Sequence, residues 1–159
     1  MLLELKRQID TERAQLHHIL KTHKGLLTRC RKVTPTVDEL AALAAILHGF
    51  YNGVENIFKR IAVALDGNAP QGEFWHSDLI EKMTCPSKKR PALLSNTLNE
   101  QLQEYLDFRH VFRHAYTFDL KWLKMKHLVV GCKTILQQLE KEIEVFFIKL
   151  EPSDKKYRG

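Results

Sequence analysis

Few cysteines, prolines and glycines occur in this sequence, and it has no long apolar run. The 159 residues include only 3 Cys, 7 Gly and 5 Pro, whereas 28% are charged, which argues against collagen-like, linker-like and disordered classes. Cys30, Cys85 and Cys132 stand far apart without C-x-x-C spacing, so neither a disulfide framework nor a cysteine-rich zinc site is expected. The longest nearly apolar run, 40–50, is far shorter than the roughly 20 residues of a spanning helix, and no membrane association is expected.

The size and charge of the chain limit the kind of protein it can be. With 44% hydrophobic residues, a chain of this length can bury one ordinary core, so we expect one domain over 1–150 and a flexible basic tail over 151–159. The first residues lack an apolar block followed by a small-residue cleavage site, and a cytoplasmic protein is therefore expected. The net charge of +6 favours polyanionic partners such as RNA, DNA or acidic proteins.

Apolar residues in the first half recur at alternating spacings of three and four, which predicts amphipathic helices. A first seam over 2–30 predicts one long helix that ends near Val33. Thr36 and Glu39 have the spacing of a capping box, so a second long helix is expected to begin there. It should end before 66–72, which has a turn-and-loop composition.

The second half predicts three further helices. Ser77 is expected to cap a short helix that Pro86 closes, and Ser95 to cap a third long helix that runs to about Tyr116. Asp119 is expected to cap a fourth long helix that reaches about Leu150. No segment shows the period-two alternation of a strand, so the fold class is all-α, an antiparallel bundle of four long helices and one short helix.

Four residues stand out within the first two predicted helices. Gly49 and Gly53 share one helix face, which predicts a close approach by another helix, from the same chain or, alternatively, from a second subunit. Glu12 and His23 interrupt the first apolar seam, and we expect them to belong to a polar layer of the bundle.

Reactive side chains concentrate at the end of the third long helix. Continuing its seam from Tyr105 places Arg109 on the inward face, where a permanent positive charge requires an anionic partner, fixed water or a polar cleft. Glu55 is a candidate anchor for Arg109 or for His110. His110 and His114 are one turn apart, and an end of the helix near His114 would let these groups converge.

These residue types suit the cleavage of RNA. An RNA phosphodiester carries its own nucleophile, the ribose 2′-OH, so a cleaving site needs mainly a proton-transfer group and a cation for the charged phosphorane. Histidine exchanges protons near neutral pH, and a guanidinium matches phosphate oxygens. The hydroxyl of Tyr116 can orient a phosphate. The scheme requires no metal and no cofactor.

The spacing of Arg109, His114 and Tyr116 fits the motif R-x(4–6)-H-x-Y. Together with the stretch 49–58, the segment 75–79 and the Arg90-Pro91 pair, this motif resembles the HEPN superfamily, specifically the HepT-like toxins of MNT-HEPN toxin–antitoxin pairs. The resemblance extends over roughly residues 3–150.

The resemblance implies a HEPN-like bundle that forms a homodimer with two motifs in a shared cleft. It implies a metal-independent endoribonuclease toxin of a type VII-like toxin–antitoxin system, which cleaves RNA, for example transfer RNA, to 2′,3′-cyclic phosphate and 5′-OH ends. Arg109 would stabilise the phosphorane and His114 would transfer the proton, while His110, Arg113 and Tyr116 would bind substrate. The cognate MNT nucleotidyltransferase antitoxin would AMPylate Tyr116, where added negative charge repels an RNA phosphate.

Other interpretations remain open. The chain could be a non-catalytic helical module that binds a nucleotide or a partner, with Arg109 used for docking or for a structural ion pair. A metal-dependent hydrolase is a third interpretation, because His110 and His114 have the i, i+4 spacing of helical metal ligands, although no third ligand is identifiable. The stretch 87–91 predicts an exposed basic loop, and RNA contact by Lys88, Lys89 and Arg90 is the functional alternative.

Overall fold

The computed structural model describes residues 1–151, and these residues form helices without any β-strand. Four helices are long and two are short: α1 (Leu2–Thr22), α2 (Lys24–Arg29), α3 (Val37–Ile61), α4 (Trp75–Thr84), α5 (Asn96–His114) and α6 (Trp122–Leu150). The all-α prediction is therefore confirmed. Residues 152–159, most of the predicted tail, lie outside the described residues, and the domain bounds stay a prediction.

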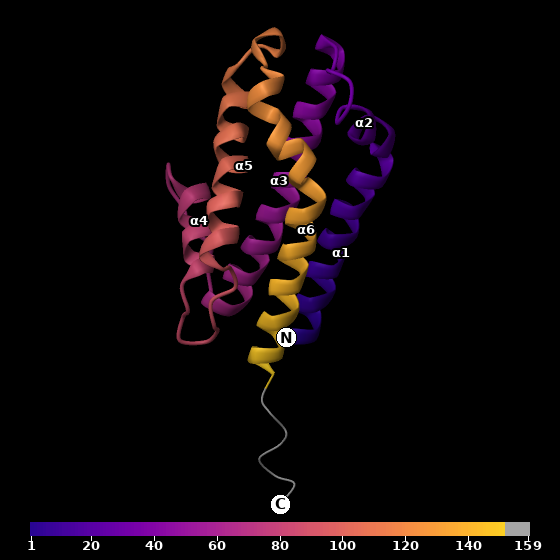
Figure 1. The fold of residues 1–159 in the computed structure, drawn as a ribbon. Helices are drawn as coiled ribbons and strands as arrows, with labels where there is room; N and C mark the ends of the chain where they lie inside the picture. The colour runs from indigo at the N-terminus through magenta and orange to yellow at the C-terminus, as the bar shows by residue number, and fades with distance from the viewer. Residues whose placement is uncertain (152–159) are drawn as a thin grey trace, which may run out of the picture.

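Helix α3 lies in the middle of the bundle and packs against α1, α4, α5 and α6 (Figure 1). Helices α5 and α6 run antiparallel beside each other, joined at one end by the 3-10 turn η2 (Thr117–Asp119). Helix α4 lies on the outer side of α5. None of the helices within residues 1–151 combines the length and apolarity needed to cross a bilayer.

Local capping signals set the starts of two long helices. The side chain of Thr36 accepts a hydrogen bond from the backbone N–H of Glu39, and the Glu39 carboxylate accepts from the backbone of Thr36, both at 3.2 Å. The hydroxyl of Ser95 accepts from the backbone N–H of Leu98 at 3.2 Å. Two of the four predicted caps, Thr36 and Ser95, are therefore confirmed, and each depends only on residues three apart in sequence.

Several predicted helix boundaries are wrong. The first helix does not continue to Val33, since it is broken at His23, where the backbone leaves the helical region (φ −104°, ψ 17°). The short helix begins at Trp75 rather than after Ser77, and Asp119 belongs to the η2 turn, so the last helix begins only at Trp122. A brief break that keeps the apolar seam in phase leaves the periodicity unchanged, and periodicity therefore does not detect it.

Glycines bring α1 and α3 close together, as predicted. A Cβ atom on Gly53 would lie 2.5 Å from Cδ2 of Leu16, and one on Gly49 would lie 3.6 Å from Cδ1 of Ile19. Leu16 is fully buried. The neighbouring helix belongs to the same chain, so the missing side chains serve packing within the bundle.

Candidate functional site

An open cleft of about 550 Å³ lies between the C-terminal part of α5 and the beginning of α4. It contains four of the five site residues that the sequence predicts, all from α5, whose last residue is His114. The cleft is lined by Gly72, Glu73, Phe74, Trp75, His76, Ser77, Leu106, Asp107, Arg109, His110, Arg113 and His114.

Arg109 is half-buried and faces α3, as the seam predicts. Its Nε atom donates a long hydrogen bond of 3.4 Å to Oδ1 of Asn52. Glu55 is not its anchor, because that carboxylate binds a residue of α4 instead, and the prediction that Glu55 holds Arg109 or His110 is wrong. Within residues 1–151 Arg109 forms no ion pair, so its charge is available to an anion in the cleft.

The two motif-region histidines lie side by side on the exposed face of α5. The ring centroids of His110 and His114 are 4.7 Å apart, with the planes tilted by 58°. Both side chains and that of Arg113 are exposed. Helix α5 therefore brings two imidazoles and two guanidiniums to one open wall.

Tyr116 is not among the residues that line this cleft. The helix ends at His114, Ala115 adopts an extended conformation, and Tyr116 is 72% exposed beyond it. Its ring stacks on that of Phe118, with centroids 5.3 Å apart and planes 4° from parallel. The predicted end of this helix near Tyr116 is two residues too late, because the chain leaves helical geometry after His114.

A polar stripe on α3, which sequence reasoning mostly missed, faces this end of α5. Four polar residues share one face of this otherwise apolar helix, because they are spaced by three, one and three positions: His48, Tyr51, Asn52 and Glu55. Polar residues that repeat at helical spacing among apolar ones are the signal that would have found them. The ring centroids of His48 and of Phe112 of α5 are 5.3 Å apart.

Within the stripe, Tyr51 and Glu55 are buried and His48 and Asn52 are half-buried, and two of its polar atoms have no hydrogen-bond partner among the described residues. Nδ1 of His48 and the hydroxyl of Tyr51 are buried and have no hydrogen-bond partner among residues 1–151. Burial, followed by the positive charges of Arg109 and Arg113, lowers the pKa of His48. Burial and the neighbouring Glu55 carboxylate raise the pKa of Tyr51, so its phenol stays protonated at neutral pH. The environment therefore favours neutral rings beside Arg109.

Glu55 and His76 form the shortest polar contact in the cleft region. Nδ1 of His76 lies 2.6 Å from Oε2 of Glu55, which is only 3% exposed. Lys59, one turn along α3, has its ammonium 3.9 Å from Glu55 and 4.2 Å from the centroid of the Trp75 ring. This cluster ties α3 to the start of α4 at the wall of the cleft opposite α5.

The predicted basic loop is only partly exposed. Lys88 and Lys89 are exposed, but the Arg90 side chain is 1% exposed and donates from Nε to Oδ1 of Asp66 at 2.8 Å and from Nη2 to Oδ2 at 2.9 Å. It also donates to backbone carbonyls, including that of Cys85. The prediction of an exposed Arg90 is therefore wrong, because a partner 24 residues away in the sequence buries it.

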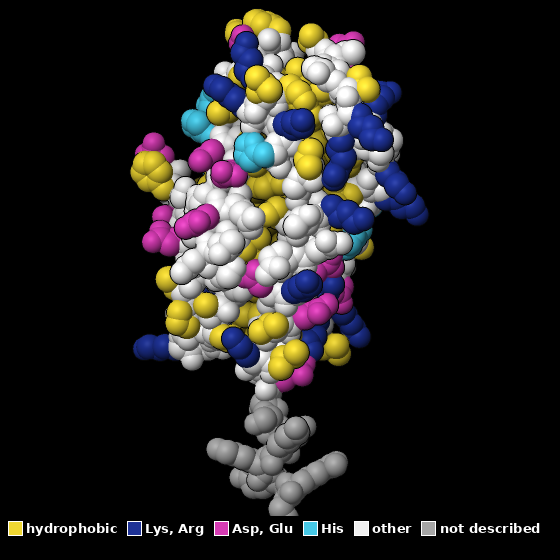
Figure 2. Space-filling model, viewed as in Figure 1, with side chains coloured by type: hydrophobic (Ala, Val, Ile, Leu, Met, Phe, Trp, Pro, Cys, Tyr) yellow, Lys and Arg dark blue, Asp and Glu magenta, His cyan; other side chains and the backbone are white. Residues whose placement is uncertain are grey.

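Positive charge extends from the cleft over the same end of the bundle. Arg109 and Arg113 of α5 are followed by Lys121, Lys124 and Lys126 with Asp119 as the single acid among them. Figure 2 shows further Lys and Arg side chains gathered over α1, α2 and the first half of α6. Within residues 1–151, no three His, Cys, Asp or Glu side chains are grouped so that they could hold a metal ion.

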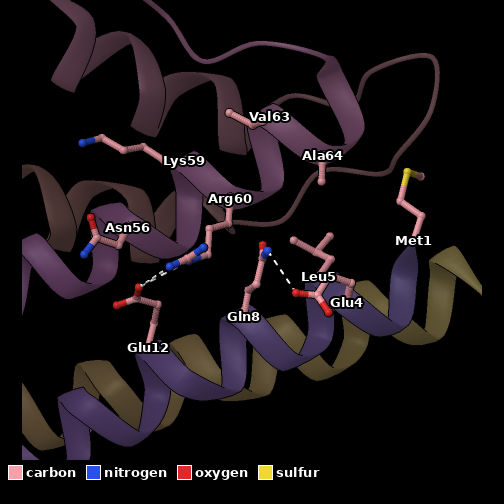
Figure 3. Close-up of a pocket in the computed structure, with 10 residues that line it drawn as sticks. All are labelled: Met1, Glu4, Leu5, Gln8, Glu12, Asn56, Lys59, Arg60, Val63 and Ala64. Carbon is pink, nitrogen blue, oxygen red and sulfur yellow. Dashed lines mark hydrogen bonds and ion pairs between the residues drawn. The ribbon is translucent and has the colours of Figure 1, made fainter.

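A second cavity, of about 620 Å³, lies between α1 and α3 and has none of the predicted site residues in its walls (Figure 3). Glu12 extends across it to Arg60, whose Nη2 donates to Oε1 at 3.0 Å. His23 is exposed at the break after α1 and is not part of this contact. Glu12 therefore pairs with Arg60 of α3. The predicted polar layer that joins Glu12 and His23 is wrong.

The fold and the cleft define a class of proteins: all-α bundles that carry Arg and His at the end of one helix in an open, basic site. A family model described as HepT-like protein matches residues 42–150. The chain belongs to this HepT-like family of the HEPN superfamily, which confirms the resemblance and points to a HEPN-type ribonuclease toxin. No curated protein and no solved structure matches the chain.

Proposed function

We propose that this protein is a metal-independent endoribonuclease toxin that acts as a homodimer. One observation carries the proposal: Arg109, His110, Arg113 and His114 line a single open cleft. The two guanidiniums can each bind phosphate oxygens through paired N–H donors, and of the two exposed imidazoles in the same cleft His114 can move a proton.

In the proposed reaction the 2′ oxygen of RNA attacks the adjacent phosphorus. His114 takes the 2′-OH proton, and Arg109 stabilises the negative charge that develops on the phosphorane. The bond from phosphorus to the 5′ oxygen then breaks, that oxygen takes up a proton, and the products carry a 2′,3′-cyclic phosphate and a 5′-OH. His110 and Arg113 position the phosphate, and Tyr116 binds RNA at the rim of the cleft.

Regulation by a nucleotidyltransferase antitoxin fits the position of Tyr116. Its phenol is exposed beyond the helix end, where a modifying enzyme has access. An AMP group on this oxygen adds negative charge and bulk beside the cations of the cleft, and both oppose the docking of an RNA phosphate.

Dimerisation is supported by apolar side chains exposed at the same end of the bundle. Val111 of α5 is 53% exposed and Leu123 of α6 is 89% exposed. Apolar side chains grouped on a surface mark contact sites with other proteins. A second copy seated there brings its own motif helix close to the first.

An RNA-cleavage assay with a chelator present tests this function. We expect the wild-type protein to release 2′,3′-cyclic phosphate ends, and His114→Ala to lose about 10²–10⁴-fold in rate. His18→Ala, at an exposed position of α1, is the matched control and should cleave like wild type. Unchanged cleavage by His114→Ala contradicts the mechanism, and a wild-type protein that binds RNA without cleaving it favours the non-catalytic binding module.

A further inference from the structure

The Glu55–His76 pair is not part of the motif, yet it lies at the wall of the same cleft. Glu55 comes from the polar stripe of α3 and is almost fully buried, and a buried carboxylate is stable only when it is hydrogen-bonded or paired. Its close partner is Nδ1 of His76, at 2.6 Å, while Lys59 is more distant at 3.9 Å.

The ring of His76 is held from two directions. Glu55 binds it at Nδ1, and Trp75 stacks on it with ring centroids 3.6 Å apart and planes 29° from parallel. The ammonium of Lys59 in turn lies over the Trp75 ring, 4.2 Å from its centroid. The imidazole is therefore fixed in orientation, in contrast to the exposed rings of His110 and His114.

The contact with Glu55 also decides which ring nitrogen is free. A carboxylate only accepts hydrogen bonds, so Nδ1 carries the proton that it donates to Glu55. Nε2 has no hydrogen-bond partner among residues 1–151, and His76 is a lining residue of the cleft. His76 therefore offers Nε2 to a ligand from the α4 wall, while Arg109 and His114 approach from the α5 wall.

We propose that His76, held by Glu55, is the second proton-transfer residue of the cleft and protonates the leaving 5′ oxygen of RNA. This rests on the proposed ribonuclease function. As the bond from the 2′ oxygen to phosphorus forms, the 2′-OH proton passes to His114. As the bond from phosphorus to the 5′ oxygen breaks, the electron pair stays on that oxygen, which takes the proton from Nε2 of His76.

The roles of the two histidines follow from their neighbours. A carboxylate that accepts from Nδ1 fixes the orientation of the imidazole and leaves Nε2 as the nitrogen that meets a ligand in the cleft. His114 has no such carboxylate partner within the described residues. The charged and titratable groups around His76 are Glu55 and Lys59 from α3 and, along the cleft, Glu73, Asp107, Arg109, His110, Arg113 and His114.

The test compares two substrates that differ only in their leaving group. One is an RNA dinucleotide, whose 5′ oxygen must be protonated as it leaves, and the other is a nucleoside 3′-(4-nitrophenyl) phosphate, whose nitrophenolate leaves without a proton. The variant is His76→Asn, because the amide nitrogen of Asn takes the place of Nδ1 and keeps the donor to Glu55 while Nε2 is lost.

We expect His76→Asn to lose about 10²–10⁴-fold on the dinucleotide and less than about tenfold on the nitrophenyl substrate. His114→Ala, by contrast, should lose activity on both. Equal losses of His76→Asn on both substrates overturn the proposal. So does full activity on the dinucleotide, which would mean that another group, such as the motif histidine of a second copy, supplies the proton.

A second variant covers the case in which His76→Asn does not fold. Glu55→Gln keeps an acceptor for Nδ1 but removes the charge, and it should slow cleavage of the dinucleotide by about tenfold or more while sparing the nitrophenyl substrate. Circular dichroism confirms folding of each variant. Wild-type protein that cleaves neither substrate overturns the proposed function itself, whereas loss in His114→Ala with none in His76→Asn or Glu55→Gln overturns only this inference.

Discussion

Arg90 and Asp66 are joined by two hydrogen bonds, from Nε to Oδ1 and from Nη2 to Oδ2, at 2.8 and 2.9 Å. Burial alone would raise the pKa of Asp66, but the hydrogen bonds from Arg90 and Ser87 outweigh it and hold that pKa below its usual value. The pair fastens the π-helical turn η1 (Ala62–Asp66), which follows α3, to the loop between α4 and α5, and so helps to hold α4 against the bundle.

Removing this cation should therefore unfold the protein more easily. Arg90→Ala leaves the Asp66 carboxylate with the weaker contacts of the Ser87 hydroxyl at 3.0 Å and the Lys82 ammonium at 3.6 Å, and we expect the free energy of unfolding to fall by about 1–3 kcal/mol. Lys88→Ala, at an exposed position two residues earlier, should change it by less than about 0.5 kcal/mol. Urea denaturation measures both, and equal stabilities of the two variants would show that the pair is not needed for the fold.

The close contact of α1 and α3 predicts opposite effects for two Gly→Ala changes. Gly53→Ala places a methyl group 2.5 Å from Cδ2 and 3.2 Å from Cγ of the fully buried Leu16, so that side chain must shift and overpacking should cost about 1–3 kcal/mol. Gly25→Ala meets no atom within 4 Å and lies in α2, where Ala favours the helix by about 0.5–1 kcal/mol. Thermal unfolding should show a lower Tm for the first and an equal or higher Tm for the second; a raised Tm for Gly53→Ala would contradict the packing.

The half-buried position of His48 beside Arg109 and Arg113 predicts a pH-dependent stability. Because folding lowers its pKa, the unfolded chain takes up the proton first, so His48 contributes fully above the ordinary value of about 6.5 and loses its contribution as the pH falls through that value. His48→Gln, which stays neutral, should lose less stability than wild type between pH 7.5 and pH 5.5. Denaturation at the two pH values measures this, with His18→Gln on the surface as the control. If His48→Gln shows the same pH dependence of stability as wild type, the prediction is wrong.

Modification by the antitoxin should be specific for one tyrosine. After co-expression with a cognate nucleotidyltransferase, we expect the intact mass to rise by one or more AMP groups and RNA cleavage to fall. Tyr116→Phe should abolish the rise in mass. Tyr51→Phe should leave it intact, because the Tyr51 side chain is fully buried. A rise in mass that persists in Tyr116→Phe would place the modification elsewhere.

The exposed apolar end predicts the surface of dimer contact. Leu123→Asp puts a charge on the most exposed part of that end, and we expect it to shift the protein from dimer to monomer without loss of helical content. Leu3→Asp, at a similarly exposed apolar residue of α1, should remain dimeric. Sedimentation velocity distinguishes the monomer from the dimer. A dimeric Leu123→Asp protein would show that the dimer contact does not depend on Leu123.

Local signals predicted most of the fold, whereas the site was predicted only in part. The capping pairs at Thr36 and Ser95 and the glycine face of α3 are readable because they depend on residues within one or two turns. The motif spacing correctly places Arg109 and His114 on one helix end. The position of Tyr116 does not follow from helical spacing, because that spacing applies only where the helix continues and α5 ends at His114.

What the sequence by itself determined is the all-α class, the order of the long helices and the basic, histidine-rich end of α5, all of which follow from short-range periodicity and composition. Only the tertiary structure decided which polar groups meet. Glu55 pairs with His76 rather than with Arg109, and Arg90 is buried on Asp66 rather than exposed in a loop. Both pairs join residues more than twenty positions apart, and such partners are chosen by how the helices pack, because every buried charge must be matched by whichever group the packing brings within reach.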